Sequence, residues 1–235
     1  MKNRKRILLK LSGEALAGDE KFGINPEILE QMTSEISEVI ASGSEVAIVI
    51  GAGNFFRGSL GEKLGIDRVQ GDHMGMLATV MNSLAVQDSL KQKGIDARVM
   101  TAIEMTEVAE KYVISRALNH LNKGRVVIIG GGTGHPFFTT DTAASLRAVE
   151  LQADVLLKAT RVDGVYSADP EKDSSAVKIP EISFSEVLHK RLGVMDLTAI
   201  SLCMENNMPI VVFNLFDEGS LKKIIEGEKI GTKIQ

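Results

Sequence analysis

Two lysines that interrupt apolar runs are the residues of this sequence best suited to chemistry. Lys10 follows Ile7-Leu-Leu9, and Lys158 follows Val155-Leu-Leu157. A charge among apolar residues is costly unless a partner offsets it, and exposure at a strand end is the ordinary explanation. If both lysines lie at one edge of a sheet, however, their ammonium groups would neutralise charge on a phosphoryl group in transfer. That reaction depends mainly on positioning and electrostatic stabilisation.

Three glycine-rich turns follow apolar runs and suit the binding of phosphate. They are Lys10-Leu-Ser-Gly13, Gly51-Ala-Gly-Asn54 and Gly130-Gly-Gly-Thr-Gly134. Unhindered backbone N–H groups in such turns form concave anion sites. One such turn is more often a plain connection, but three at the same sheet edge favour an anion site. The P-loop pattern does not occur in the sequence. The dinucleotide fingerprint Gly-x-Gly-x-x-Gly fails because Phe56 and His135 stand where its third glycine is required.

The third turn continues into a predicted helix N-terminus that carries a carboxylate. Thr139, Thr140 and Asp141 lie there, where free N–H groups and the positive end of the helix dipole gather. Its position alone supports helix capping and a direct site role for Asp141 equally, and the two lysines favour the second.

The segment of residues 160–170 is polar and rich in turn signals. It offers Tyr166 to a flat base and Asp169 to a ribose hydroxyl. Its Asp-Gly and Asp-Pro pairs are equally typical of plain turns, so both interpretations stay open here.

Secondary-structure elements must position these residues. Short apolar runs, typical of strands, alternate with segments of helical periodicity along the chain. Continuous apolar runs are typical of parallel strands that are buried on both faces. The alternation along the whole length predicts an α/β fold with a mostly parallel sheet. No long linker or composition shift divides the chain, so residues 1–235 are predicted to form one domain. The predicted strands contain residues 7–9, 46–50, 97–100, 126–129, 155–157 and 210–213.

Two predicted helices carry clear end signals. One contains apolar residues from Ile28 to Ile40 on one face, with Asn25 suited to its N-cap and Gly43 to its end. Ser183-Phe-Ser-Glu186 is typical of a capping box at the start of another.

A third helix, predicted over residues 73–90, is apolar around much of its circumference. Met74, Leu77, Met81 and Leu84 share one face, while Met76, Val80 and Ala85 lie elsewhere. Core packing is the preferred interpretation, and a subunit interface is the second.

Composition excludes several classes of protein. The chain has 27 basic and 31 acidic residues, a formal net charge of −4, which offers no general attraction for nucleic acid or an anionic membrane. No stretch approaches the roughly 20 apolar residues of a membrane span. A single cysteine, Cys203, excludes an internal disulfide, and the four histidines share no metal-ligand spacing. A cytoplasmic protein without a metal site of its own is predicted.

Five segments in order along the chain resemble the bacterial uridylate kinases of the amino acid kinase family. Two of them, Asp72-His-Met-Gly-Met76 and Pro136-Phe-Phe-Thr-Thr-Asp141, are specific to that group. The resemblance implies transfer of the γ-phosphoryl group of ATP to UMP, with Mg²⁺ bridging phosphates. It also implies a three-layer α/β/α sandwich and a homohexamer. The five segments are residues 10–14, 51–58, 71–76, 132–141 and 157–170.

The resemblance also implies roles for individual residues. Lys10 and Lys158 would flank the transferring phosphoryl group, and Asp141 would hold both ammonium groups in position. Asp72 would accept a hydrogen bond from the UMP ribose, and Arg57 would bind phosphate between the nucleotides. The implied ATP-binding residues are Lys10, Leu11, Ser12, Gly13, Gly53, Arg57, Thr160, Tyr166 and Asp169. The implied UMP-binding residues are Ala52, Arg57, Asp72, Thr133, Gly134, His135, Pro136, Phe137, Phe138, Thr139 and Thr140.

The same resemblance implies regulation by nucleotides, and the sequence departs from the group's pattern at two positions. GTP is expected to activate and UTP to inhibit, and the segment linked to GTP would contain Gly18, Asp19, Glu20, Lys21, Phe22 and Gly23. Ala52 stands where glycine is common and adds a methyl group near the expected UMP phosphate. His135 stands where Asn is usual, and an imidazole there predicts a pH-dependent affinity for UMP.

Two alternatives stay open. Another member of the family would phosphorylate a carboxylate, such as an acylglutamate or aspartate, and would not need Asp72 to meet a ribose. A protein that only binds a nucleotide or oxyanion would need the glycine turns but not both lysines, so Lys10 and Lys158 favour an enzyme.

Overall fold

The computed structural model describes residues 4–20, 22–56, 61, 63–168, 173 and 175–235, which fold into three layers. Within these residues, one nine-stranded sheet has the order β4-β3-β5-β2-β1-β6-β10-β11-β9, and only the pairing of β10 with β11 is antiparallel. This confirms the predicted α/β class and mostly parallel sheet. The strands are β1 (Arg6–Leu11), β2 (Glu45–Ile50), β3 (Ala97–Thr101), β4 (Glu110–Lys111), β5 (Val126–Gly130), β6 (Val155–Thr160), β9 (Glu181–Ile182), β10 (Ile210–Asn214) and β11 (Thr232–Ile234). A separate hairpin pairs β7 (Val165–Tyr166) with β8 (Lys178–Ile179).

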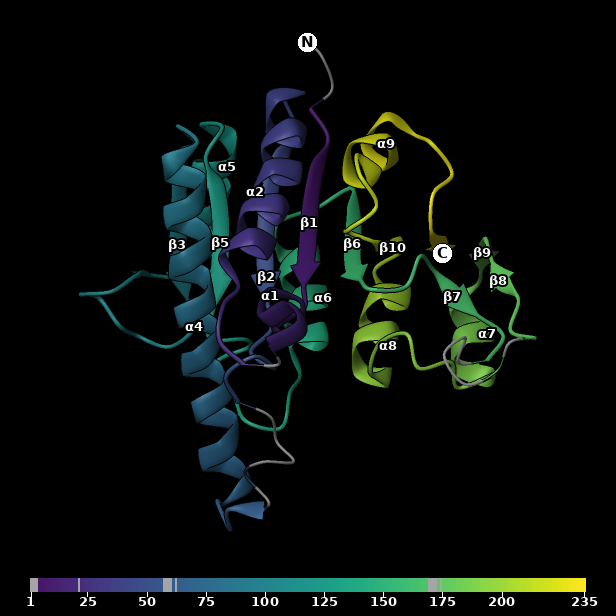
Figure 1. The fold of residues 1–235 in the computed structure, drawn as a ribbon, viewed down its shortest axis with the longest axis horizontal. Coiled ribbons are helices and arrows are strands. Elements are labelled where there is room, and N and C mark those ends of the chain that lie inside the picture. The colour runs from purple at the N-terminus through teal and green to yellow at the C-terminus, as the bar shows by residue number, and fades with distance from the viewer. Residues whose placement is uncertain (1–3, 21, 57–60, 62, 169–172, 174) are drawn as a thin grey trace.

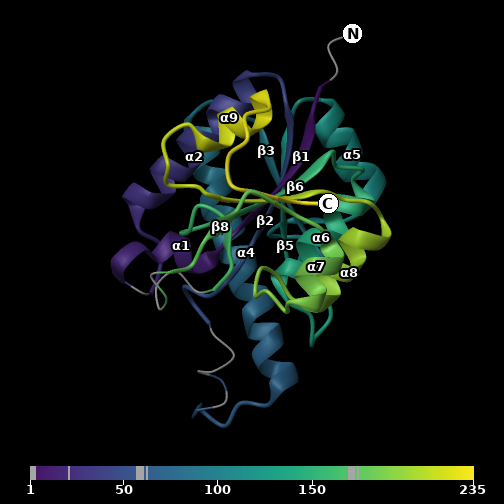
Figure 2. The same ribbon diagram turned by 90° about the vertical axis from the view of Figure 1, so that its right-hand side faces the viewer.

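Helices cover both faces of the sheet, as Figure 2 shows with the sheet seen between them. One face packs against α1 (Gly13–Ala17), α2 (Pro26–Ala41), the C-terminal half of α4 (Arg68–Gln92) and α9 (Ser220–Glu226). The other packs against α5 (Ile114–Asn122), α6 (Thr140–Glu150), α7 (Phe184–His189) and α8 (Leu197–Glu205). A short 3₁₀ turn, η1 (Gly18–Glu20), follows α1.

Side chains of β1 point alternately to the two faces of the sheet, so this strand packs against both helical layers. Ile7, Leu9 and Leu11 belong to the core beneath α2, whereas Leu8 belongs to the core beneath α6. Successive side chains of a strand point to opposite faces, so Lys10 points to the same face as Leu8. In β6, Leu156 belongs to the α6 core and Leu157 to the α2 core, which puts Lys158 on the α6 face as well.

The predicted end signals are confirmed. The side chain of Asn25 accepts hydrogen bonds from the N–H groups of Glu27 and Ile28, and Gly43 follows α2 with a φ of +91°. Ser183 and Glu186 form the capping box of α7.

Helix α4 differs from its prediction in two ways. It begins at Arg68, five residues before the predicted start, because Asp67 caps it by accepting from the N–H of Val69. Core packing was the wrong interpretation for Met74, Leu77 and Met81, which are 41%, 46% and 52% exposed. The N-terminal half of α4 extends beyond the sheet (Figure 1), and these three side chains are exposed there. None of the helices in the described ranges combines the length and apolarity needed to cross a membrane.

Candidate functional site

Two lysines and one carboxylate meet at the carboxyl edge of the sheet. Lys10 and Lys158 are register partners on the adjacent parallel strands β1 and β6. Lys10 Nζ lies 2.7 Å from Asp141 Oδ1, and Lys158 Nζ lies 2.9 Å from Asp141 Oδ2. All three side chains are at most 15% exposed. The sheet register therefore brings Lys10 and Lys158 together, and α6 adds Asp141, so the three predicted catalytic residues form one cluster.

Helix α6 presents Asp141 to these lysines. Its N-cap is Thr139, whose Oγ1 accepts from the N–H groups of Asp141 at 3.1 Å and Thr142 at 3.2 Å. Because Thr139 supplies the cap, the Asp141 carboxylate is left to pair with the lysines. Its place in the first turn also suits its negative charge.

The charges in this cluster depend on one another. Burial alone would raise the pKa of Asp141, but the ammonium groups of Lys10 and Lys158 outweigh it and hold that pKa below its ordinary value. Burial lowers the pKa of Lys158, which the attraction of Asp141 opposes without cancelling. Asp141 therefore stays ionised at neutral pH, and Lys158 loses its proton more readily than an exposed lysine.

A loop that the sequence did not reveal completes this cluster. Lys158 also donates to the backbone carbonyl of Val194. Two residues later, Asp196 caps α8 through the N–H of Ala199 and accepts from the hydroxyls of Thr142, at 3.0 Å, and Thr139. An Asp before an apolar helix is a visible capping signal, but its contact with α6 depends on tertiary packing.

The glycine turns lie at the same edge of the sheet. A Cβ atom on Gly13 would lie 2.5 Å from the carbonyl oxygen of Gly51, so the first two turns touch through their backbones and Gly13 admits no side chain. In the third turn, Gly131 and Gly132 have φ values of +78° and +59°, which glycine adopts without strain. The predicted convergence of three turns at one edge is confirmed.

A pocket of about 320 Å³, here called the Asp72 pocket, lies beside the second and third turns. It is lined by seven residues predicted to bind one nucleotide, and also by several that were not predicted, such as Phe56, Met76 and Thr79. The predicted lining residues are Ala52, Asp72, Thr133, His135, Phe138, Thr139 and Thr140.

Asp72 already has partners in this pocket. Its Oδ2 accepts from the N–H of Phe137 at 2.7 Å, and both carboxylate oxygens accept from Arg68 Nε at 3.0 and 2.9 Å. Phe137 has a φ of +72°, an uncommon conformation for a bulky residue. Asp72 therefore holds the loop after the third turn, so a ligand hydroxyl that binds Asp72 must share the carboxylate with this loop.

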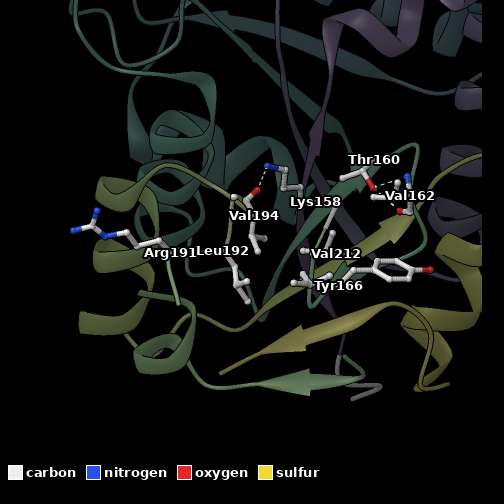
Figure 3. A pocket seen from close by; sticks show the side chains of 12 residues that line it. Lys158, Thr160, Val162, Tyr166, Arg191, Leu192, Val194 and Val212 are labelled. Atoms are coloured by element: carbon white, nitrogen blue, oxygen red, sulfur yellow. Dashed lines mark hydrogen bonds between the residues drawn. The ribbon is translucent and has the colours of Figure 1, made fainter. Parts of the chain in front are cut away.

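A second pocket of about 510 Å³, here called the Tyr166 pocket, lies on the other side of the lysines. Lys158, Thr160 and Tyr166 line it, together with apolar side chains that include Val165, Leu192, Val194 and Val212. Figure 3 shows Lys158 directed toward Val194 at one side of the pocket and Arg191 pointing away from the other labelled side chains. The hydroxyl of Tyr166 donates to Asp163 Oδ1 at 2.6 Å. Apolar walls with few polar groups suit a flat nucleobase.

The cluster of Lys10, Lys158 and Asp141 connects these two pockets. Lys158 lines the Tyr166 pocket, and Thr140, the neighbour of Asp141, lines the Asp72 pocket. Two ligands would therefore meet where positive charge is fixed.

Some predicted residues lie elsewhere. The predicted binding residues that line neither pocket are Lys10, Leu11, Ser12, Gly13, Gly53, Gly134, Pro136 and Phe137. Arg57, Asp169 and Lys21 lie outside the described residues. Gly18, Asp19 and Glu20 line a separate pocket of about 550 Å³ with Arg161. Phe22 packs edge-on against Phe55, and Gly23 bonds to Asn54.

The donor atoms near the site do not favour a metal held by the protein alone. Within the part of the chain that the structure describes, no group of three or more His, Cys, Asp or Glu side chains could hold a metal ion. Asp141 is also engaged by two ammonium groups.

Comparisons with known proteins agree with this geometry. A model of the amino acid kinase family matches residues 5–214. The UMP kinase from Bacillus anthracis is 43% identical, with a TM-score of 0.96 over 98% of this chain and 96% of that one. The UMP kinase from Ureaplasma parvum is 33% identical, with a TM-score of 0.94 over 99% of both chains. The uridylate kinase from Archaeoglobus fulgidus is 30% identical, with a TM-score of 0.75 over 97% of this chain and 99% of that one.

Proposed function

The chain belongs to the amino acid kinase family and resembles its UMP kinases over nearly the whole length, and from this premise we propose that it transfers the γ-phosphoryl group of ATP to UMP. The products are UDP and ADP. The observation that carries the proposal is the pair of buried ammonium groups fixed by Asp141 between two pockets. Fixed positive charge at that point stabilises the charge that spreads over a phosphoryl group in transfer.

In this proposal each nucleotide takes one pocket. UMP occupies the Asp72 pocket and ATP the Tyr166 pocket, so the acceptor and donor phosphates meet at Lys10 and Lys158. A phosphate oxygen of UMP attacks the γ-phosphorus as the bond from that phosphorus to the β-phosphate oxygen breaks. A phosphate monoester has a second pKa near 6 and is largely a dianion at neutral pH, so no residue need remove a proton. Asp141 then acts by positioning, which fits a carboxylate that is already paired twice.

Recognition of uracil is proposed for the loop of residues 133–140. Uracil differs from cytosine at N3–H and O4, which backbone carbonyl and N–H groups read directly. Thr133, His135 and Phe138 bring that loop to the Asp72 pocket. Asp72, which binds the N–H of Phe137, links base recognition to the ribose.

Mg²⁺ is proposed to enter with the phosphates of ATP. When bound with ATP, the ion would supply further positive charge to the transferred group. The chain itself contributes Lys10 and Lys158 on the protein side, together with the backbone N–H groups of the glycine turns.

The test is a coupled assay of ADP release across UMP, CMP, dUMP, aspartate and acylglutamate. UMP is expected to give the highest kcat/KM. Turnover of an amino acid without turnover of UMP would instead support the carboxylate kinase alternative. Nucleotide binding without turnover of any acceptor would support a protein that only binds.

We propose assembly into a homo-oligomer, specifically the hexamer that the resemblance implies, and the exposed apolar face of α4 supports an interface between copies. Met74, Leu77 and Met81 lie along it, and single soluble chains seldom expose such a patch without a partner. This was the second interpretation of that helix from the sequence.

We also propose how the enzyme is regulated and where it acts. GTP is proposed to activate and UTP to inhibit, with residues 18–23 as the GTP segment. The carboxylates of Asp19, Glu20 and Glu27 line the pocket there, so the sugar and base suit it better than the phosphates. The enzyme is proposed to act in the cytoplasm.

A further inference from the structure

Two buried asparagines form a reciprocal pair of hydrogen bonds beneath the second glycine turn. Asn54 ends that turn, and Asn82 lies in the middle of α4. Asn54 Nδ2 donates to Asn82 Oδ1 at 2.9 Å, and Asn82 Nδ2 donates to Asn54 Oδ1 at 2.8 Å. Asn54 is 1% exposed and Asn82 0% exposed. Water therefore cannot replace either partner without rearrangement.

The remaining amide hydrogens of the pair bind the backbone of two loops. Asn82 Nδ2 donates to the carbonyl of Gly51 at 2.8 Å, and Asn54 Nδ2 donates to the carbonyl of Gly23 at 2.8 Å. Every side-chain N–H of both residues thus has an acceptor. A fully satisfied buried network of this kind rigidifies the groups it joins.

The Gly51 carbonyl that Asn82 binds is also the group against which the first glycine turn rests. A Cβ on Gly13 would lie 2.5 Å from this oxygen and 2.7 Å from Asn54 Oδ1. The N–H of Gly51 in turn donates to the carbonyl of Leu11 at 2.9 Å. A shift of the amide pair would therefore move both turns relative to each other and to Lys10.

We propose that Asn82, paired with Asn54, is a positioning residue for phosphoryl transfer. It fixes the Gly51 carbonyl, so the N–H groups of the first two glycine turns stay directed toward the phosphoryl group beside Lys10. This inference rests on the proposed kinase function. Asn82 touches no substrate and acts through the turns.

Substitution of Asn82 by Asp tests the role with little change of shape. A carboxylate at position 82 has no hydrogen to donate, and it repels the Gly51 carbonyl and Asn54 Oδ1. We expect Asn82→Asp to lower kcat by about 10- to 100-fold at pH 8, as for a small misplacement of catalytic groups, with a smaller rise in KM for UMP. Acidification should recover part of the loss, because a protonated carboxyl group at this position can donate one hydrogen bond.

Ser89→Ala is the matched control. Ser89 also lies buried on α4, where its hydroxyl bonds Thr33 Oγ1 at 2.8 Å, away from the turns. The Ser89→Ala variant should be less stable than the wild type, but its kcat should stay within about twofold and should not rise on acidification. An equal loss of kcat in Ser89→Ala, or a folded Asn82→Asp with wild-type kcat, would overturn the inference.

A second variant and a readout without substrate complete the test. Asn54→Ser breaks the pair but leaves Asn82 free to bind Gly51, and it should lower kcat by about three- to tenfold; wild-type kcat in the folded variant would contradict the role. Hydrogen exchange at residues 51–55 should be faster in both asparagine variants and unchanged in Ser89→Ala. Unchanged exchange overturns the positioning role even if the wild type fails to phosphorylate UMP, a failure that would count against the proposed function instead.

Discussion

At the scale of single residues, the central feature is one carboxylate shared by two ammonium groups. Replacing Lys10 with Ala removes half of the positive charge opposite Asp141. We expect Lys10→Ala to lower kcat by about 10² to 10⁴, as when a group that stabilises a charged transition state is removed. Steady-state kinetics with UMP and ATP measure this. A variant that folds, binds UMP and turns over at the wild-type rate would contradict the role of Lys10.

The dependence of activity on pH follows from Lys158. Burial lowers the pKa of Lys158, so activity is retained below that pKa and lost as pH rises through it, at a lower pH than for an ordinary lysine. Asp141 opposes this effect. In Asp141→Asn the basic limb of kcat should therefore move toward neutrality, and kcat should fall. An unmoved limb in the pH profile would mean that Lys158 does not control it.

Asp72 binds both its own loop and, in the proposed function, the ribose of UMP. We expect Asp72→Asn to raise the KM for UMP more than it lowers kcat, because a contact made equally in ground and transition states affects binding more than chemistry. The KM for ATP should change little. A change confined to the KM for ATP would place Asp72 on the donor side.

At the scale of elements, helix α6 positions the Asp141 carboxylate between Lys10 and Lys158. Thr139→Val keeps the shape of the side chain but removes the cap, and this should cost about 1 kcal/mol of unfolding free energy. Ser183→Ala, which removes the cap of α7, should cost a similar amount. Only Thr139→Val should also lower kcat, since only that cap lies beside Asp141. Denaturant unfolding and kinetics on both variants measure the two effects, and equal kcat values would contradict the positioning role of α6.

Strands and turns could be predicted because their signals are local. The run of residues 46–50 is apolar throughout since β2 is buried on both faces, and Asn25 with Pro26 marks the start of α2 regardless of the rest of the fold. The period-2 geometry of β1 and β6 then puts Lys10 and Lys158 on one face once the strands are known to be neighbours.

Other features required the tertiary structure. Asp196 and Val194 reach Lys158 and α6 only because α8 packs against α6. The amide pair of Asn54 and Asn82 joins residues 28 positions apart, with no periodicity to indicate it. On α4, the sequence showed apolar residues on several faces but not which of them the sheet would cover.

At the scale of the whole molecule, the exposed apolar face of α4 predicts association between copies of the chain. Met81→Glu should reduce the mass of the assembly, because a charge would be buried against an apolar surface. Gln31→Glu, which adds a charge at an exposed position of α2, should leave the mass unchanged. Light scattering after size-exclusion chromatography measures both. An assembly of the same mass in Met81→Glu would mean that this face is not the interface.

The sheet also determines how the two pockets relate to each other. Adjacent parallel strands end at one edge, and the pockets lie on either side of the lysines that β1 and β6 carry there. In the proposed function, two nucleotides must therefore bind together with their phosphates facing the same cluster.

A crystal structure of the chain with UMP and a non-hydrolysable ATP analogue tests this most directly. We expect the γ-phosphoryl group to lie within about 3 Å of both Lys10 Nζ and Lys158 Nζ, with the UMP phosphate opposite it and the ribose at Asp72. A γ-phosphoryl group bound away from both amines, or UMP bound outside the Asp72 pocket, would contradict it.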